Sequence, residues 1–386
     1  MEQELWTGGG GNLRAHSSVC FSRALIDGPR IQQLLLHCAA ALESNDATLA
    51  QQAMWVLNNI AFSQGDPSQR LTSWLLRALV ARACRLCVPA GAAQAAAASA
   101  PAPRERAMSV TELAEYVDLT PWHRFGFTAS NGAILRAVAG SAAVHVVDLS
   151  LGVSDEEIGL RLANFAKSKG VQLEFSVVKC GSPSPSPTSS PPKKQVALCQ
   201  DLASVLSDRQ SLGLRDGEAL VVNCQSWLRH VAPGSRDAFL DAVRALNPCL
   251  VTVTDEDADL DSPSLATRIA GCFDFHWILF DALDTSAPRD SPRRVEHEAA
   301  VGWKIESVVG ADDADGAERS ESGARLAERM RRNGFASVGF DEEAAGEVRR
   351  LLSEHATGWG VKREEDMLVL TWKGHGAVYT GAWTPN

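Results

Sequence analysis

The run "AVHVVDLSLG", residues 143–152, is where the chain could begin nucleotide chemistry, because a valine-rich strand closes on Asp148 and a loop follows. Phosphates bound by parallel sheets need several glycines at the strand end. Here Gly152 stands where a dinucleotide-binding loop has three glycines, and Ser150 replaces the first glycine of a methyltransferase Asp-x-Gly-x-Gly motif. We therefore predict a structural strand without a bound cofactor. Within it, we expect His145 to be a packed histidine on a sheet face, with a ligand role as the alternative.

Other catalytic and metal-binding signatures are incomplete. "HEAAV" at 297–301 lacks the second histidine of a zinc protease, and Cys84 and Cys87 have no second ligand pair at zinc-finger spacing. "DEDADLD" at 255–261 resembles a calcium loop in its acids, but Leu260 stands where that loop needs glycine. We interpret this segment as a solvated acidic loop at a strand end. We expect no catalytic, metal-binding or cofactor-binding residues, and a protein that is not an enzyme.

One basic cluster has the spacing to contact DNA phosphates. In "RLAERMRRNGF", Arg325, Arg329 and Arg332 share one helical face and Arg331 flanks it. Three or four phosphate contacts support only weak, salt-sensitive binding. The alternative is a solvated helix whose arginines pair with Glu328 and neighbouring acids. The chain's 37 basic and 47 acidic residues give a net charge of −10, so we expect DNA contact to be indirect or weak.

Several serines precede proline in segments rich in small and polar residues. A proline-directed kinase would turn such hydroxyls into dianions, although a plain flexible spacer explains the same composition. The candidate phosphorylation sites are Ser182, Ser184, Ser186, Ser190 and Ser291.

Composition limits where the protein works. The nine cysteines are odd in number and scattered, which favours a reducing compartment over a disulfide framework. The sequence has no apolar run of membrane-spanning length and no secretory signal at its start, so we expect neither secretion nor membrane insertion.

Helices and strands alternate along most of the chain. Apolar residues at one-face spacing predict a helical bundle over 29–88, and "DPSQ" at 66–69 reads as a capping box. Valine-rich runs alternating with helical patterns then predict a parallel sheet with helices on both faces. Strands are expected at 143–149, 171–178, 219–224 and 249–254, helices at 154–169, 195–211 and 236–246, and an antiparallel hairpin from Met367 to Trp383.

Several segments resemble, in order, those of the plant-specific GRAS family of transcriptional regulators. "LLLHCAAALESNDATLAQQAMWVLNNIA" resembles the first leucine-rich region, and "LANFAKSKGVQLEFSVV" resembles the second. "FGFTASNGAILRAV" holds a Thr-Ala-x-Asn core that ends at Asn131, and "VHVVD", with His145 and Asp148, stands in the place of the Val-His-Ile-Ile-Asp motif.

The end of the chain extends this likeness. "GWGVKREEDMLVLTWKGHGAVYTGAW" places Trp359, Trp372 and Trp383 where the family's terminal motif has aromatic residues. The resemblance spans about residues 29–384, and the scarecrow-like branch fits best.

The resemblance implies an α/β fold with a Rossmann-like, methyltransferase-like core, an α-helical cap subdomain and a C-terminal antiparallel hairpin. It also implies nuclear transcriptional control, as an adaptor or co-regulator that binds DNA-binding transcription factors and other GRAS proteins, with homo- or heterodimers and no membrane. The alternatives are a direct sequence-specific DNA-binding transcription factor, a purely structural interaction protein and, less favoured, an S-adenosylmethionine-dependent methyltransferase-like enzyme.

The sequence departs from the family pattern at three places. The terminal Ser-Ala-Trp is Gly381-Ala382-Trp383, and a family Phe-Tyr pair reads Phe275-His276. After Gly152 the chain runs directly into the next helix, so one αβ unit of the family core is expected to be missing. The predicted organisation is a disordered N-terminus (1–28), a mainly helical cap (29–120, with a linker at 89–106) and a core (121–386, with a low-complexity linker at 181–194).

Overall fold

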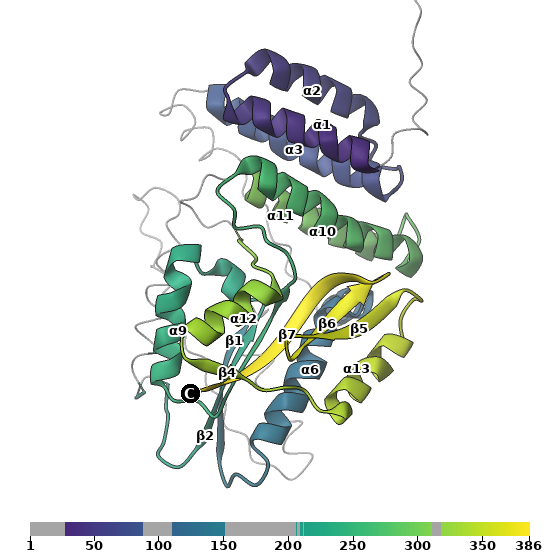
Figure 1. The fold of residues 1–386 in the computed structure, drawn as a ribbon. Coiled ribbons are helices and arrows are strands. Elements are labelled where there is room, and N and C mark those ends of the chain that lie inside the picture. Colours follow the sequence, from purple (N-terminus) through teal and green to yellow (C-terminus); the bar gives the residue numbers. More distant parts are fainter. Residues whose placement is uncertain (1–27, 88–109, 151–205, 207–208, 211, 311–317) are drawn as a thin grey trace, which may run out of the picture.

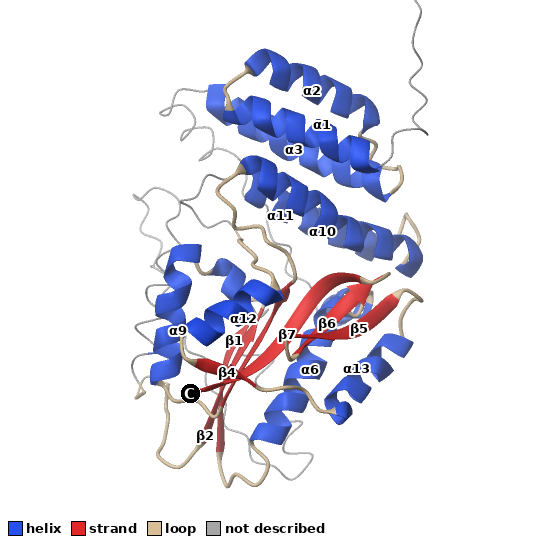
Figure 2. Ribbon diagram, viewed as in Figure 1, coloured by secondary structure: helices blue, strands red, loops and turns tan. Residues whose placement is uncertain are grey.

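A bundle of helices lies on one end of a mixed sheet in the computed structural model of the protein (Figure 1). Figure 2 shows the two parts by secondary structure, with the helical cap above and the strands below. The structure describes residues 28–87, 110–150, 206, 209–210, 212–310 and 318–386.

The upper cap consists of α1 (Gly28–Glu43), α2 (Ala47–Ile60) and α3 (Pro67–Cys87). Each buries one apolar face, as their sequence spacing predicts. The capping box of α3 is formed: the Gln69 backbone N–H donates to the Asp66 carboxylate at 2.9 Å, and the Asp66 N–H donates to the Gln69 side chain at 3.1 Å. The predicted bundle over 29–88 is confirmed.

Two later helices, α10 (Leu265–Ser286) and α11 (Pro292–Gly310), pack beneath α1 and α3. The short helix α5 (Val110–Asp118) contacts α11. The predicted boundary at residue 120 assigned α10 and α11 to the core, whereas in the structure both helices also pack against the N-terminal helices.

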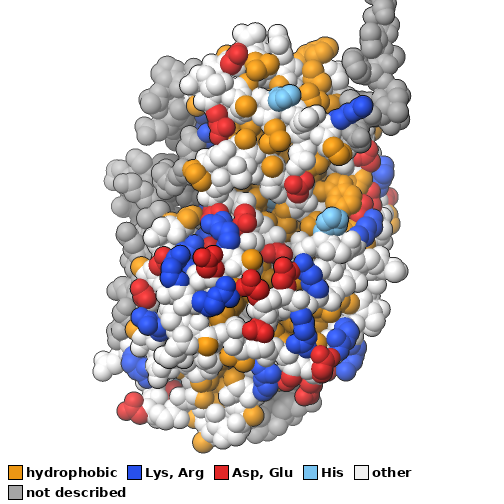
Figure 3. Space-filling view, in the orientation of Figure 1, with side chains coloured by type: hydrophobic (Ala, Val, Ile, Leu, Met, Phe, Trp, Pro, Cys, Tyr) orange, Lys and Arg blue, Asp and Glu red, His pale blue; other side chains and the backbone are white. Residues whose placement is uncertain are grey.

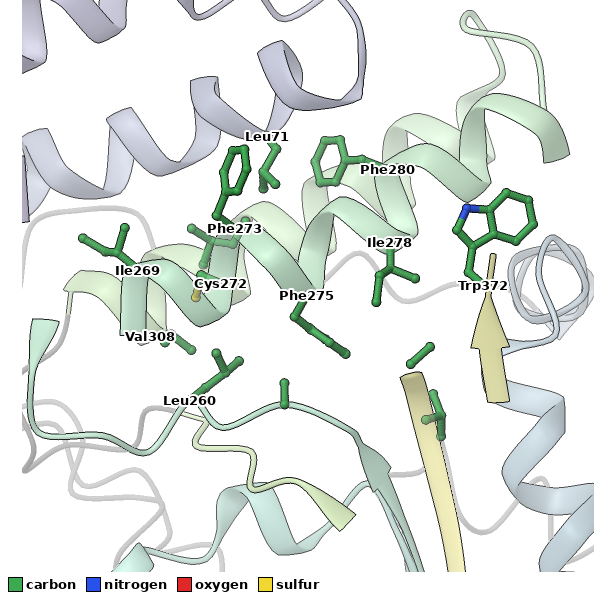
Figure 4. Packing of buried hydrophobic residues seen from close by; sticks show 14 of the residues in the cluster. Leu71, Leu260, Ile269, Cys272, Phe273, Phe275, Ile278, Phe280, Val308 and Trp372 are labelled. Atoms are coloured by element: carbon green, nitrogen blue, oxygen red, sulfur yellow. The ribbon is translucent and has the colours of Figure 1, made fainter. Parts of the chain in front are cut away.

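The helix α10 is buried on two opposite sides. Figure 4 shows Phe273 and Phe280 directed toward Leu71 of α3, while Phe275 and Ile278 point the other way, toward the core. Burial of both sides joins cap and core into one continuous apolar cluster.

The sheet of the described residues has seven strands in the order β1-β2-β3-β7-β6-β5, with β4 beside β7. β1, β2 and β3 run parallel, and β7 pairs antiparallel with β3, β4 and β6. The strands are β1 (Val144–Ser150), β2 (Ala219–Gln225), β3 (Leu250–Glu256), β4 (Phe335–Ser337), β5 (Trp359–Glu364), β6 (Met367–Trp372) and β7 (His375–Pro385).

Helices cover both faces of this sheet. α6 (Trp122–Ala137) and α13 (Glu342–Ser353) share one apolar cluster with it, and α9 (Arg236–Ala245) and α12 (Gly323–Arg332) share the other. Two 3₁₀ turns, η2 (Leu228–His230) and η3 (Pro233–Ser235), connect β2 to α9. In the part of the chain that is described, no helix has the length and apolar composition needed to cross a bilayer.

The mixed α/β fold predicted from the sequence is confirmed, and so are three of its strands, the helix over 236–246 and the terminal hairpin. The predicted elements at 154–169 and 171–178, most of the helix at 195–211, both linkers and the junction at Gly152 lie outside the described residues.

Candidate functional site

A polar ladder crosses the face of the sheet that α6 covers. The Asn223 amide donates to the Asp148 carboxylate at 2.9 Å, and the Thr252 hydroxyl donates to Asn223 Oδ1 at 2.7 Å. These side chains satisfy one another within the sheet, at paired positions of β1, β2 and β3. The ladder consists of Asp148, Asn223, Gln225, Thr252, Thr254 and Thr380 from the strands and Ser130 from α6.

The helix α6 reaches this ladder through Ser130 rather than through the predicted motif residue. Ser130 is buried and accepts a hydrogen bond from the Gln225 amide at 2.9 Å, whereas Asn131 is exposed on the outer side of α6. A Cβ at Gly126 would lie 2.5 Å from Thr254, so a glycine allows α6 to approach the sheet this closely. The sequence motif located the helix but not the side chain that points inward.

His145 belongs to the opposite face of β1. Its Nδ1 lies 3.2 Å from the Glu218 carboxylate, and the ring is half-buried. A hydrogen bond from the Arg215 backbone N–H and the contact with His145 hold the pKa of Glu218 below its usual value. His145 is therefore a partner of Glu218 in a contact on this face of the sheet.

A buried ion cluster fills the space beyond β2 and β3. Arg229, on the turn after β2, lies 2.5 Å from the Asp255 carboxylate and 2.9 Å from that of Glu256. Lys304 of α11 pairs with Glu256 and lies 3.5 Å from Glu318. Because the cluster joins strand ends of the core to a cap helix, it fixes the two parts against each other. We call these five residues the ion cluster.

The ion cluster holds two cations and three carboxylates, and each carboxylate lies beside a cation. Burial alone would raise the pKa of Glu256, but Arg229 and Lys304 outweigh burial and hold that pKa well below its usual range. His276 of α10 stands beside the cluster, with Nδ1 2.9 Å from the Cys272 carbonyl. Burial, followed by repulsion from Lys304, lowers the pKa of His276 to about 4. Glu256 is therefore charged and His276 neutral near neutral pH.

The interpretation of 255–261 as a solvated loop is wrong for most of its acids. Asp255 and Glu256 are buried, and the side chain of Asp261 is 4% exposed, because each pairs with a cation of another element. Charged residues are buried only when paired, and a sequence window does not show partners that lie far away in the chain. We call the five acids of this segment the acidic hub: Asp255, Glu256, Asp257, Asp259 and Asp261.

The acidic hub also holds the start of α12. The Gly323 backbone N–H donates to Asp257 at 3.0 Å, and the Ser322 N–H donates to Asp259 at 2.9 Å. Carboxylates at a helix N-terminus satisfy unpaired N–H groups and favour the helix dipole. The hub therefore orients the helix that carries the predicted DNA-contact arginines.

All four of those arginines are paired with carboxylates. Arg325 pairs with Asp261 and lies 3.1 Å from Asp259, and Arg329 lies 2.7 Å from Asp237 and 2.9 Å from Glu321. Arg332 lies 3.0 Å from Asp237, and Arg331 lies 3.2 Å from Glu365. Figure 3 shows the corresponding mixture of acidic and basic side chains across the middle of this face. These partners differ from Glu328, the partner expected from the sequence.

The three motif tryptophans lie in the terminal hairpin and its neighbour. Trp372 and Trp383 are buried, as expected, and Trp359 packs 5.0 Å from Trp372 between ring centres. Trp372 Nε1 donates to Asp281 of α10 at 2.6 Å. Trp372 thus connects the hairpin to the cap.

The structure describes one of the five predicted phosphorylation sites, Ser291. Ser291 is partly buried directly before α11, and its carbonyl accepts a hydrogen bond from Val295. Arg294, three residues later, is buried between Asp284 and Glu298. A kinase would have to open this turn to reach Ser291. The other four serines, between 182 and 190, lie outside the described residues.

Comparisons with known proteins agree with this architecture. The model of the GRAS domain family matches residues 31–154 and 152–384. Scarecrow-like protein 32 of Arabidopsis thaliana is 39% identical, covering 93% of this chain and 94% of that protein. Scarecrow-like transcription factor PAT1 of the same plant is 24% identical, covering 90% and 75%.

A solved structure has a similar fold. The crystal structure of SCL7 in Oryza sativa aligns with a TM-score of 0.71 at 22% identity, covering 92% of this chain and 99% of that one. The family match extends over nearly all of the chain, including the strands, cap helices and hairpin described above. The chain belongs to the GRAS domain family.

Proposed function

We propose that this protein regulates transcription in the nucleus as a protein-binding adaptor, which reaches promoters through DNA-binding transcription factors or another GRAS protein. The observation that carries the proposal is the pairing of Arg325, Arg329, Arg331 and Arg332 with carboxylates. Paired arginines would have to break ion pairs before contacting phosphate. The net charge of −10 adds repulsion from DNA.

The outer face of α2 is the surface best suited to a protein partner. No residue of α2 carries a charge, and Trp55, in the middle of this helix, is 70% exposed. Leu49 and Phe62 are exposed near its two ends. Figure 3 shows few charged side chains on the corresponding upper part of the molecule. The other exposed positions around Trp55 on this helix are amides, Gln51, Gln52, Asn58 and Asn59. An exposed tryptophan on an uncharged surface is typical of a protein interface.

We propose that this protein has no enzyme activity and that its core is Rossmann-like. The ion cluster occupies the ends of β2 and β3, where a methyltransferase-like fold would hold its cofactor, and the polar ladder lies in the sheet beside it; the groups of both are hydrogen-bonded or ion-paired to one another. Micromolar binding of S-adenosylmethionine in a calorimetric titration would contradict this part of the proposal.

We also propose that one αβ unit of the family core is missing after Gly152. The family model matches in two segments that overlap at residues 152–154, which supports a junction there. Val144 and Val146, on one face of β1, are 42% and 46% exposed, which supports a strand whose cover is incomplete.

The adaptor proposal is tested by promoter occupancy in plant cells, measured by chromatin immunoprecipitation of the tagged full chain. Trp55→Asp should lose promoter occupancy, because it places a charge in the proposed partner surface. Arg331→Ala with Arg332→Ala should keep it. The reverse pattern, with both variants folded as judged by melting, would favour direct DNA binding.

A further inference from the structure

A pocket of about 450 Å³ opens between the loop after α2, the helix α3 and the helix α11. We propose that it binds an acidic segment of a partner protein, which places a carboxylate beside a large apolar side chain. This inference rests on the adaptor function and specifies the chemistry of one partner. The pocket is lined by Ser63, Gln64, Arg70, Ser73, Trp74, Arg77, Arg289, Arg294, Val295, Glu298 and Ala299.

The apolar part of the pocket is preformed. Trp74 packs so closely on α11 that a Cβ at Gly302 would overlap its ring, which fixes the position of the indole. Val295, 56% exposed, and Ala299 of α11 extend this surface. Because the walls belong to two packed helices, an apolar side chain would enter without first ordering the site.

Buried charges hold the floor of the pocket in place. Arg70 and Arg294 are each 3% exposed and share the same two acids, Asp284 and Glu298. Arg70 Nε lies 3.2 Å from Glu298 but makes no hydrogen bond. Two cations and two anions compensate one another, so these pairs provide rigidity rather than a free charge.

The rim supplies the excess positive charge. Arg289 is exposed, donates to the Gln64 carbonyl at 3.0 Å, and forms no ion pair with any residue that the structure describes. Arg77 lies 5.4 Å from the ring centres of both Trp74 and Trp303 and pairs with Glu306 at 2.6 Å. Arginine forks of this kind suit a carboxylate.

The combination favours a peptide over a nucleic acid. Asp284, Glu298 and Glu306 offset three of the four lining arginines, so one net positive charge remains at this site, on a chain whose net charge is −10. Its volume lies within the range of about 300–1,000 Å³ typical of pockets that enclose one compact group. Nucleic-acid backbones instead require a row of exposed cations. A carboxylate on Arg289 with an apolar side chain against Trp74 and Val295 satisfies both parts of the pocket.

The test begins with random twelve-residue peptides displayed on phage and selected on the full chain. Peptides that also bind the Arg289→Glu variant are removed. We expect the remaining sequences to combine acidic residues with a large apolar residue. Recovery of no peptide that separates the two proteins, or of peptides without acidic residues, would overturn the proposal.

The affinity of one selected peptide is then measured by fluorescence anisotropy. We expect Arg289→Glu and Val295→Asp each to weaken binding at least about tenfold, because both positions are exposed and line the pocket. The matched control is Arg350→Glu. Arg350 is exposed on α13, a helix that packs on the sheet and not on the pocket, so this substitution should leave the affinity unchanged. Equal affinities for all four proteins, or displacement of the peptide by a random DNA duplex, would contradict the assignment. The promoter experiment uses positions outside this pocket, so either proposal can fail alone.

Discussion

At the scale of single residues, the position of the Trp383 ring depends on the glycine two positions earlier. Its ring is buried under the α9 and α12 side of the sheet and lies over Gly381, where a Cβ would overlap the ring. The serine that the resembled family motif has at this place would not fit beside the ring in its present position. The departure at Gly381 therefore goes together with a ring that fills the core.

Replacing this ring should be costly. Trp383→Ala is expected to lower the free energy of unfolding by about 3–5 kcal/mol, because it removes a large buried aromatic side chain and leaves a cavity. Urea denaturation followed by circular dichroism measures the change. A soluble variant with unchanged unfolding would show that the ring does not contribute to the core.

Individual residues were predictable from sequence only where local spacing determines their surroundings. Asp66 and Gln69 form their capping box because both partners lie within one helical turn. Asp255 and Glu256 were assigned to solvent because their partners, Arg229 and Lys304, are remote in sequence. The inward-facing Ser130 was missed for the same reason.

At the scale of elements, the ion cluster joins β3 to the turn after β2 and to α11. Arg229→Met should destabilise the protein by about 3–5 kcal/mol, because it leaves Asp255 buried without its cation. Thermal and urea unfolding measure the loss. The double variant with Asp255→Asn should recover part of it, since the orphaned charge is removed. If the double variant is no more stable than the single one, desolvation of Asp255 is not the cause.

Amphipathic helices and short valine-rich strands were found from the sequence, whereas the place of α10, a helix buried on two sides, was not. α1 and α2 have clear periodicity because each exposes one side to water, whereas the hairpin strand β6 is buried along its whole length and was found as a short, mostly apolar run. α10 has no such alternation, since it packs on α3 with one side and on the core with the other (Figure 4). Its place in the cap therefore became visible only in three dimensions.

At the scale of the whole molecule, buried histidines make stability depend on pH, and His276 and His297 are two of the three in the described part of the chain whose pKa burial lowers to about 4, with His123 the third. Burial lowers the pKa of His297 to about 4, and that of His276 is also about 4, against an ordinary value of 6.5. Between about pH 4 and 6.5 the unfolded chain therefore binds more protons than the folded one, so stability falls as pH falls. The melting temperature should decrease from pH 7.5 to pH 5, roughly the range in which carboxylates remain ionised.

A matched variant isolates the contribution of these histidines. His276→Gln with His297→Gln should show a smaller change in melting temperature over the same pH range, whatever its absolute stability. Equal changes in the variant and the parent would mean that other groups control acid sensitivity.

The proposed loss of one αβ unit also acts on the whole fold. A family-length insert after Gly152 should cover Val144 and Val146, and should thereby raise soluble expression and the free energy of unfolding. We expect a gain of several kcal/mol, in a fold whose total free energy of unfolding is about 5–15 kcal/mol. Calorimetry of both proteins measures the difference. Cooperative melting of the present chain above about 60 °C would contradict the idea of a weakened core.

The central claim is that the protein reaches DNA through partners, and a gel-shift titration of the purified protein tests it most directly. At about 150 mM salt, roughly physiological, we expect only weak binding, near the non-specific range of about 10⁻⁴ to 10⁻⁶ M, with promoter and scrambled duplexes bound alike. Nanomolar binding that prefers the promoter, and that Arg331→Ala with Arg332→Ala abolishes, would contradict the adaptor account and make this a direct DNA-binding factor.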